Sequence, residues 1–270
     1  MLASAHYGAG PDATLKSMEA GKPNTARPQD NRLLAAIPSN VKERLFPKLK
    51  QLSLPLGKVV YESGDTMRDI IFPINSIVSL LYVMQNGASA EISVVGNEGV
   101  VGIALFMGGQ STTSRALVQS SGYAYTLHAA EMREEFNHPD GELRLLMLRY
   151  TQALITQMAQ TAVCNRHHLI DQQLCRWILL SLDRLSSNEL NMTQELIANM
   201  LGVRREGVTE AAGKLQRLGI IEYHRGRIRV LDRTKLERMA CECYAVVKKE
   251  TDRLLAPIFS ARRSSGASMA

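Results

Sequence analysis

Residues 194–211 carry the pattern that most constrains the fold of this 270-residue chain, because small or apolar residues stand at seven fixed positions within it. The small residue Ala198 lets two helices approach closely, and Gly202 can make a tight turn between them. Thr193 precedes the pattern and is a favourable N-cap for the first helix. The other five positions would bury the corner between the helices: Ile197, Leu201, Val203, Val208 and Ala211. The segment predicts a helix-turn-helix, with an ordinary helical hairpin as the alternative.

A short basic hairpin is predicted after the second helix of this motif. Gly219 is typical of a helix C-terminus, and the β-like runs 220–223 and 228–230 enclose a turn with the sequence His-Arg-Gly-Arg. Between residues 224 and 238, six cationic side chains stand against two acidic ones: Arg225, Arg227, Arg229, Arg233, Lys235 and Arg238 against Asp232 and Glu237. Such a run alone usually marks a solvated surface. Beside a helix-turn-helix, contact with DNA phosphates is the favoured interpretation.

The segment from residue 52 to residue 128 has a sequence pattern typical of antiparallel β-structure. Short helices are expected before it, over residues 33–49, where apolar residues recur at spacings of three and four. Turn signals then separate short β-rich runs, and Asn86-Gly87 is the strongest hairpin signal because both residues tolerate positive φ. No helical pattern intervenes, which favours a roll or sandwich over a parallel α/β sheet. The expected strands are 59–61, 70–72, 77–84, 90–95, 116–118 and 123–127.

A long helix of about 25 residues is predicted after residue 141 from its 3.6-residue apolar period. One apolar series runs along it at spacings of three and four: Leu143, Met147, Tyr150, Leu154 and Met158. A second series, Leu148, Ile155 and Ala162, recurs every seven residues. A stripe this broad can serve two surfaces, so we expect packing against the β-domain and also a parallel homodimer seam at Leu148, Ile155 and Met158. A further amphipathic helix is expected over residues 169–185.

The composition is that of an ordinary globular protein and does not identify a binding partner. Apolar residues make up 45% of the chain and charged residues 21%, as in ordinary globular proteins, and the net charge of +6 permits nucleic acid or an anionic surface as partner. No apolar run approaches the roughly 20 residues of a membrane helix, and no secretory signal is visible. The four cysteines do not look like an extracellular disulfide framework. We therefore expect a cytoplasmic protein with no membrane contact.

Residues 31–255 resemble the Crp–Fnr superfamily of bacterial transcription regulators, most clearly over residues 201–210, which match the family's turn and recognition-helix start. The resemblance implies an α+β fold: an N-terminal antiparallel, jelly-roll-like β-roll, a long dimerisation helix and a C-terminal winged helix-turn-helix. The expected boundaries are a disordered arm (1–30), a sensor roll that resembles a cyclic-nucleotide-binding domain (31–135), the dimerisation helix (136–168), the DNA-binding domain (169–256) and a disordered tail (257–270).

The resemblance also implies a homodimer that reads a near-palindromic double-stranded DNA operator and works with RNA polymerase. The family's base-reading positions fall on Arg205, Glu206, Thr209 and Glu210, with Arg204 beside them. Arg on guanine and Glu on cytosine fit the donor and acceptor pattern of the major groove. Position 210 often carries Arg in the family, so the operator of better-known members is not assumed. Phosphate contacts are expected from Thr193, Gln194, Lys214, Arg225 and Arg227.

The sensor segment departs from the cyclic-nucleotide cassette of the family, which runs Gly-Glu-Leu and later Arg-Ser-Ala. Here Gly102 is followed by Ile103 instead of a carboxylate, and Arg115 follows Ser114 instead of preceding it. The adenine-binding hydroxyl pair would fall near Met158, which cannot replace it. These five residues define the expected effector pocket, and we expect that cyclic AMP does not control the protein. No cofactor is expected, and the sensor ligand, the operator sequence and the choice between activation and repression stay open.

Two other classes of function are alternatives to a DNA-binding regulator. A cyclic-nucleotide-responsive subunit acting on a protein partner would need an intact cassette and no recognition helix. An enzyme would need a nucleophile and a base, and no such pair or catalytic motif is present. A metal site is not expected, because His167 and His168 diverge on a helix and Cys241-x-Cys243 with His224 lacks the usual zinc spacing. The role of Cys241 and Cys243 stays open.

Overall fold

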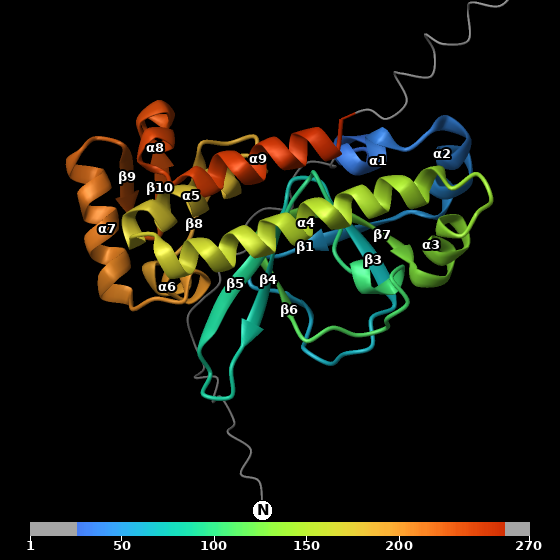
Figure 1. Ribbon diagram of the computed structural model, residues 1–270, viewed down its shortest axis with the longest axis horizontal. Coiled ribbons are helices and arrows are strands. Elements are labelled where there is room, and N and C mark those ends of the chain that lie inside the picture. The colour runs from blue at the N-terminus through green and yellow to red at the C-terminus, as the bar shows by residue number, and fades with distance from the viewer. Residues whose placement is uncertain (1–25, 257–270) are drawn as a thin grey trace, which may run out of the picture.

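The computed structural model describes residues 26–256. Two β-sheets form the N-terminal half, the long helix α4 (Glu142–His167) crosses the whole molecule, and a helical domain with its own small sheet lies at the far end of α4 (Figure 1). The α+β class and the order of its three parts are confirmed. Within the described residues, no helix is both long and apolar enough to cross a lipid bilayer.

Short helices close one end of the β-roll. They are η1 (Pro28–Asp30), α1 (Arg32–Ala36), α2 (Ser39–Leu45) and η2 (Phe46–Lys48). The buried Asn31 side chain accepts hydrogen bonds from the amides of Leu33 and Leu34 and donates to the carbonyls of Pro73 and Gly99. This cap fixes α1 on the roll. The folded chain therefore begins before residue 31, inside the segment predicted as a disordered arm; residues 1–25 and the predicted tail 257–270 lie outside the described residues.

The roll consists of two antiparallel sheets. One has the order β1-β7-β3 and the other the order β2-β6-β4-β5. The strands are β1 (Lys50–Leu54), β2 (Val59–Tyr61), β3 (Asp69–Pro73), β4 (Ile77–Val83), β5 (Ser89–Val95), β6 (Arg115–Ser120) and β7 (Gly122–His128). All six predicted strands are present, and the β4–β5 hairpin turns at Gly87 with φ of 85° as expected. Strand β1 was not predicted, because its five residues contain a single alternating apolar pair, Leu52 and Leu54, and only Leu54 is buried.

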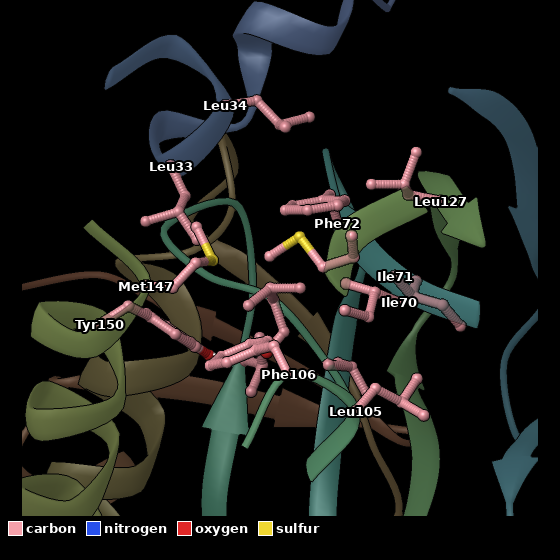
Figure 2. Close-up of a cluster of buried hydrophobic side chains, with 14 of the residues drawn as sticks. Leu33, Leu34, Ile70, Ile71, Phe72, Leu105, Phe106, Leu127, Met147 and Tyr150 are labelled. Atoms are coloured by element: carbon pink, nitrogen blue, oxygen red, sulfur yellow. The ribbon is translucent and has the colours of Figure 1, made fainter. Parts of the chain in front are cut away.

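The core of the roll is filled by aliphatic and aromatic side chains from both sheets and from the helices around them. Figure 2 shows Phe72, Ile70 and Leu127 from the strands, Leu33 and Leu34 from α1, and Leu105 and Phe106 beside them. Helix η3 (Ile103–Leu105) contributes Leu105 to this cluster, and α4 closes the cluster from the side with Met147 and Tyr150 (Figure 2). The Tyr150 hydroxyl donates a hydrogen bond of 2.9 Å to the carbonyl of Val100. Helix α3 (Ala129–Phe136) lies between β7 and α4 in the chain.

Helix α4 has two apolar faces, as its sequence predicts. One face is buried against the roll through residues that include Leu143, Met147, Tyr150 and Leu154. The other leaves large apolar side chains exposed: Leu145, Leu148, Ile155 and Val163. Met158 is half-buried and packs against the roll core, so it lies at the border between the two faces.

The C-terminal domain contains the helices α5 (Ile170–Leu182), α6 (Gln194–Leu201), α7 (Arg205–Arg217), α8 (Arg233–Met239) and α9 (Glu242–Leu254). Its sheet has the order β8-β10-β9, with β8 (Glu189–Asn191), β9 (Ile221–His224) and β10 (Arg227–Val230). A second core cluster holds these elements together and includes Ile77, Leu81 and Val94 from the roll. Helix α9 runs back along α4 (Figure 1), an arrangement that was not predicted from the sequence.

A buried polar network also joins the roll to the C-terminal domain. Arg184, 6% exposed as a side chain, donates to Glu98 Oε1 at 2.7 Å and to Gln157 Oε1 at 2.9 Å. Gln157 in turn donates to Ser93 Oγ at 2.7 Å. A Cβ added to Gly96 would lie 2.6 Å from Cβ of Arg184, so this close approach requires glycine. Removal of either partner would leave an uncompensated buried charge, so this network couples the roll to the C-terminal domain.

Candidate nucleic-acid interface

Helices α6 and α7 form the predicted helix-turn-helix. The Thr193 hydroxyl accepts a hydrogen bond of 3.3 Å from the amide of Leu196 and caps α6 as expected. Gly202 ends α6 with φ of 67°, a left-handed conformation that favours glycine. The residues predicted to fill the corner are buried, apart from the partly buried Val203: Ile197, Ala198, Leu201, Val208 and Ala211.

A glycine inside the second helix is explained by packing between helices. A Cβ on Gly207 would lie 2.8 Å from Cδ1 of Ile170, which begins α5. Helix α5 therefore approaches α7 closely at this point. A Cβ at position 207 would require the Ile170 side chain to move aside, which offsets part of the roughly 1 kcal/mol that glycine costs relative to alanine in a helix interior.

The residues predicted to read bases lie on one exposed end of α7. Arg204 is its N-cap residue and Arg205 its first residue, and both are exposed together with Glu206, Thr209 and Glu210. Among the described residues, the four charged side chains of this group form no ion pair. The Thr209 hydroxyl lies 2.8 Å from Gln194 Oε1 and 3.0 Å from the Arg205 carbonyl, either of which can accept its proton. The structure thus gathers these residues at one surface, with their charges available to a ligand.

Lys214, predicted to contact phosphate, has a partner within the protein. Its ammonium group forms an ion pair with Asp171 at the start of α5, and this hydrogen bond raises the pKa of Lys214. The pair holds α7 against α5. A phosphate contact by Lys214 would have to compete with Asp171, which the sequence pattern did not indicate because 43 residues separate the two positions.

The wing consists of β9, β10 and a two-residue turn between them. Arg225 and Gly226 both have positive φ, 47° and 78°, which is the conformation of a type I′ hairpin turn. A groove of about 490 Å³ lies along the wing and is lined by His224, Arg225, Arg227, Arg229, Glu189, Glu222 and Asn191. Arg229 pairs with Glu222 at 2.6 Å, and Arg227 lies 3.9 Å from Glu189. No hydrogen bond or ion pair of Arg225 exists within residues 26–256, so it is the wing cation most available to a phosphate.

Most residues of the expected effector pocket make contacts within the roll itself. Gly102 has φ of 101°, and the next residue, Ile103, packs with Met158 against the roll core. Arg115 forms an ion pair with Glu62, Nε to Oε2 at 2.7 Å, and Ser114 is buried. Glu62 was missed by the sequence analysis, because it lies on a different segment 53 residues away.

The cysteines show an arrangement that spacing along the chain did not predict. Cys164 and His168 lie at the end of α4, next to Cys241 and Cys243 at the start of α9, and ligand atoms of all four lie within 4.8 Å of one another. His224, the only other candidate ligand that the sequence suggested beside Cys241 and Cys243, belongs to the wing. The expectation of no metal site is therefore not supported by the structure, since the folding of α9 onto α4 brings the missing ligands from elsewhere.

Comparisons with known proteins agree with this arrangement. A family model described as a Crp-like helix-turn-helix domain matches residues 172–239, whereas no curated protein matches the chain. A solved regulator assigned to the crp/fnr family from Eubacterium rectale is similar at 15% identity and a TM-score of 0.61, over 77% of this chain and 96% of that chain.

Two further solved structures show the same fold. A CRP/FNR-family transcriptional regulator from Thermus thermophilus is 23% identical, with a TM-score of 0.56 over 71% of this chain and 98% of that one. The c-di-GMP-responsive global regulator CLP of Xanthomonas campestris is 16% identical, with a TM-score of 0.56 over 72% and 99% of the two chains.

Proposed function

The chain has the fold of Crp/Fnr-type transcription regulators with a Crp-like helix-turn-helix domain, and from this premise we propose that it is a homodimer that reads a near-palindromic DNA operator. The observation that carries the proposal is the exposed end of α7, where Arg204, Arg205, Glu206 and Glu210 have no ion-pair partner among the described residues. Charged groups left unpaired on a recognition helix can bond to base edges without first breaking an internal pair.

Each predicted contact has a chemical counterpart on DNA. The Arg205 guanidinium can donate two hydrogen bonds to O6 and N7 of guanine, and the Glu206 carboxylate can accept from N4 of cytosine. Thr209 lies one turn further along the same face of α7 and can reach a neighbouring base or its phosphate. The wing cation Arg225 and the N-terminal end of α6, at Thr193 and Gln194, are suited to phosphate contacts.

The exposed face of α4 supports the homodimer. Leu148 and Ile155 are 49% and 55% exposed, and with Gln152, Ala159 and Ala162 they follow spacings of four and three residues. This is the a/d spacing of a coiled-coil seam. Two copies joined along α4 would place their recognition helices on half-sites about 34–36 Å apart, one turn of DNA.

The state of the roll supports an effector other than cyclic AMP. Arg115, the cation nearest to the family's phosphate-binding position, is paired with Glu62, and Ile103 offers no acceptor for a ribose hydroxyl. The Xanthomonas neighbour responds to c-di-GMP, so this fold does accommodate different effectors. A regulator of this kind would act in the cytoplasm, where it would meet its operator and RNA polymerase.

The proposal is tested by selection of bound fragments from random double-stranded DNA, followed by footprinting with the full chain. We expect an enriched sequence with two inverted half-sites one turn of DNA apart. A single bound dimer should protect both half-sites in the footprint. The wild-type protein should bind the enriched site about 10³-fold or more tightly than scrambled DNA. Equal binding to all fragments, or a single half-site with one protomer bound, would contradict the proposal.

A further inference from the structure

A buried cluster of three thiols and one imidazole lies where the end of α4 meets the start of α9. Cys164 is in the last turn of α4 and His168 is its C-cap residue, whereas Cys241 is the N-cap residue of α9 and Cys243 lies in its first turn. The three cysteines are buried, and the His168 side chain is 16% exposed. The four ligand atoms lie within 4.8 Å of one another.

The distances within the cluster are close to those of a tetrahedral metal site. Sγ of Cys164 lies 3.5 Å from Sγ of Cys241, and Sγ of Cys243 lies 3.5 Å from Nδ1 of His168. A tetrahedral Zn²⁺ with bonds of about 2.3 Å to sulfur and 2.0–2.1 Å to nitrogen separates two sulfurs by about 3.8 Å and sulfur from nitrogen by about 3.5 Å. Only small movements would therefore be needed to place one ion among the four atoms.

Groups around the cluster hold the ligands in orientations that suit a metal. His168 Nε2 lies 3.4 Å from Glu242 Oε1, so a proton on Nε2 would leave Nδ1 free to face the sulfurs. Gln160 donates to Sγ of Cys243 at 3.2 Å, and Gln173 donates to the carbonyl of His168 at 2.8 Å. Metal-ligating histidines commonly donate their second N–H to a carboxylate, and such outer partners tune the affinity of the site.

We propose that Cys164, His168, Cys241 and Cys243 bind one thiophilic divalent cation, with Zn²⁺ as the expected ion. Three thiolates and one imidazole complete a tetrahedral shell without an open position, which is the composition of structural zinc sites. Binding would release the three thiol protons to solvent and leave the site with one net negative charge. The fourth cysteine, Cys175, is buried in a different cluster and takes no part.

The location gives the ion a role in the proposed regulator. Cys164 and His168 end the helix that would form the dimer seam, and Cys241 and Cys243 begin the last helix of the DNA-binding domain. One ion bound by both pairs would fix the DNA-binding domain relative to the dimer. This second step rests on the proposed function, whereas the binding of the metal does not.

Metal content of the full-length protein tests the site directly. The protein is purified under reducing conditions without chelator, its zinc is measured by mass spectrometry, and the zinc-free form is titrated with Co²⁺. We expect one ion per chain and the thiolate-to-cobalt charge-transfer absorption of a tetrahedral Cys3His site. His168→Asn and Cys243→Ser should abolish stoichiometric binding, and Glu242→Gln should weaken it about 10-fold.

Two matched variants serve as controls. His167→Asn changes the exposed neighbouring histidine, and Cys175→Ala removes the cysteine outside the cluster; both should retain one ion per chain. Far-ultraviolet circular dichroism identifies any variant that fails to fold. The metal site is refuted if folded wild-type protein binds neither Zn²⁺ nor Co²⁺, or if His168→Asn binds them as tightly as the wild type. A stable Cys164–Cys241 disulfide in the native protein would equally refute it and indicate a thiol switch instead.

DNA binding separates the two proposals. Using the enriched operator, we expect at least a 10-fold lower affinity for the zinc-free protein and full recovery when zinc is restored. Bound zinc with no change in operator affinity would refute the coupling. Bound zinc in a protein that binds no operator in either form would refute the proposed function and leave the metal site intact.

Discussion

The sensor roll and the recognition helix each contain an arginine that the family resemblance assigns to an anionic ligand, and the protein treats the two differently. Arg115 of the roll is engaged by Glu62 at 2.7 Å, and the nearby Ile103 packs into the core. Arg205 on α7 is exposed and has no ion-pair partner among the described residues. Arg115 thus has an acidic partner within the protein, and Arg205 has none among the described residues.

The difference has a physical cause. A buried anionic effector needs a cation with no competing partner, because burying an unpaired charge is costly. DNA binding instead uses exposed cations that displace condensed counterions from phosphates, so unpaired arginines on the surface cost little when DNA is not bound. Arg205 is therefore open to an external ligand, whereas an anion that approached Arg115 would have to compete with Glu62.

Ile155→Lys is expected to lower operator affinity more than any other substitution, because specific binding requires the recognition helices of both protomers. The lysine would place an unpaired charge in the α4 seam and separate the protomers. Loss of the linked second half-site should lower operator affinity by about 10²–10⁴-fold. Light scattering and gel shift measure both quantities, and Val246→Lys, at an exposed apolar residue of α9, is the control. A variant that remains dimeric with full affinity would move the interface elsewhere.

Arg205→Ala removes the unpaired arginine of α7, and Arg115→Ala removes the arginine of the roll that is paired with Glu62. Loss of a bidentate base contact should cost about 1–3 kcal/mol at each half-site and relax selection at one operator position. The Arg115 variant should bind the operator as tightly as the wild type. Fluorescence anisotropy on the enriched site and on single-base variants measures this. If Arg115→Ala weakened binding as much as Arg205→Ala, the contrast between the two regions would be lost.

The pH dependence of stability tests how the two regions are joined. Glu91 on β5 is 7% exposed, Oε2 of Glu91 has no hydrogen-bond partner among the described residues, and burial raises its pKa to about 7, against the opposing influence of Arg176 and Arg184. Because the folded pKa lies above the unfolded value of about 4.5, stability should fall as pH rises from about 4.5 to about 7. Glu91→Gln should flatten this dependence and stabilise the protein at pH 8 by up to about 3 kcal/mol.

Urea denaturation at pH 5.5 and pH 8 measures the dependence, at concentrations of urea that span the transition. The exposed Glu134→Gln variant serves as control and should behave as the wild type. Equal pH dependence in the Glu91→Gln variant and the wild type would show that Glu91 is ionised throughout this range, and that the contact between roll and C-terminal domain is not the source of the effect.

A smaller effect is expected from the wing. Arg225→Ala should weaken binding to all DNA sequences alike and reduce the salt slope by about one phosphate per protomer. Arg229→Ala should have less effect, because Arg229 is already paired with Glu222. Titrations at several salt concentrations separate the two variants. A change in sequence selectivity caused by Arg225→Ala would instead assign base reading to the wing.

No effect at all is expected from cyclic AMP. Calorimetry with the purified protein should detect no binding at micromolar concentration, and operator affinity should not change. Glu62→Gln, which frees Arg115, sharpens this test: if pairing with Glu62 is what closes the site, the variant should bind the cyclic phosphate more strongly than the wild type does. Micromolar binding by the wild type together with tighter operator binding would contradict the account of the roll.

The sequence determined those features that depend on neighbouring residues. The helix-turn-helix followed from Ala198, Gly202 and the apolar spacing around them, and the β4–β5 hairpin followed from Asn86-Gly87. The two faces of α4 followed from two apolar periods in one segment. In each case helical or strand geometry converts a spacing of a few residues directly into a position on a surface.

Only the tertiary structure decided the contacts between distant segments. The pairs Arg115–Glu62 and Lys214–Asp171, the approach of Ile170 to Gly207, and the joining of Cys164 and His168 to Cys241 and Cys243 all depend on how whole elements pack. Many partners of suitable charge or chemistry are available to each of these residues along the chain. The packing of α5 on α7 and of α9 on α4 determines which partner a side chain contacts in these regions. The local sequence pattern does not predict this packing.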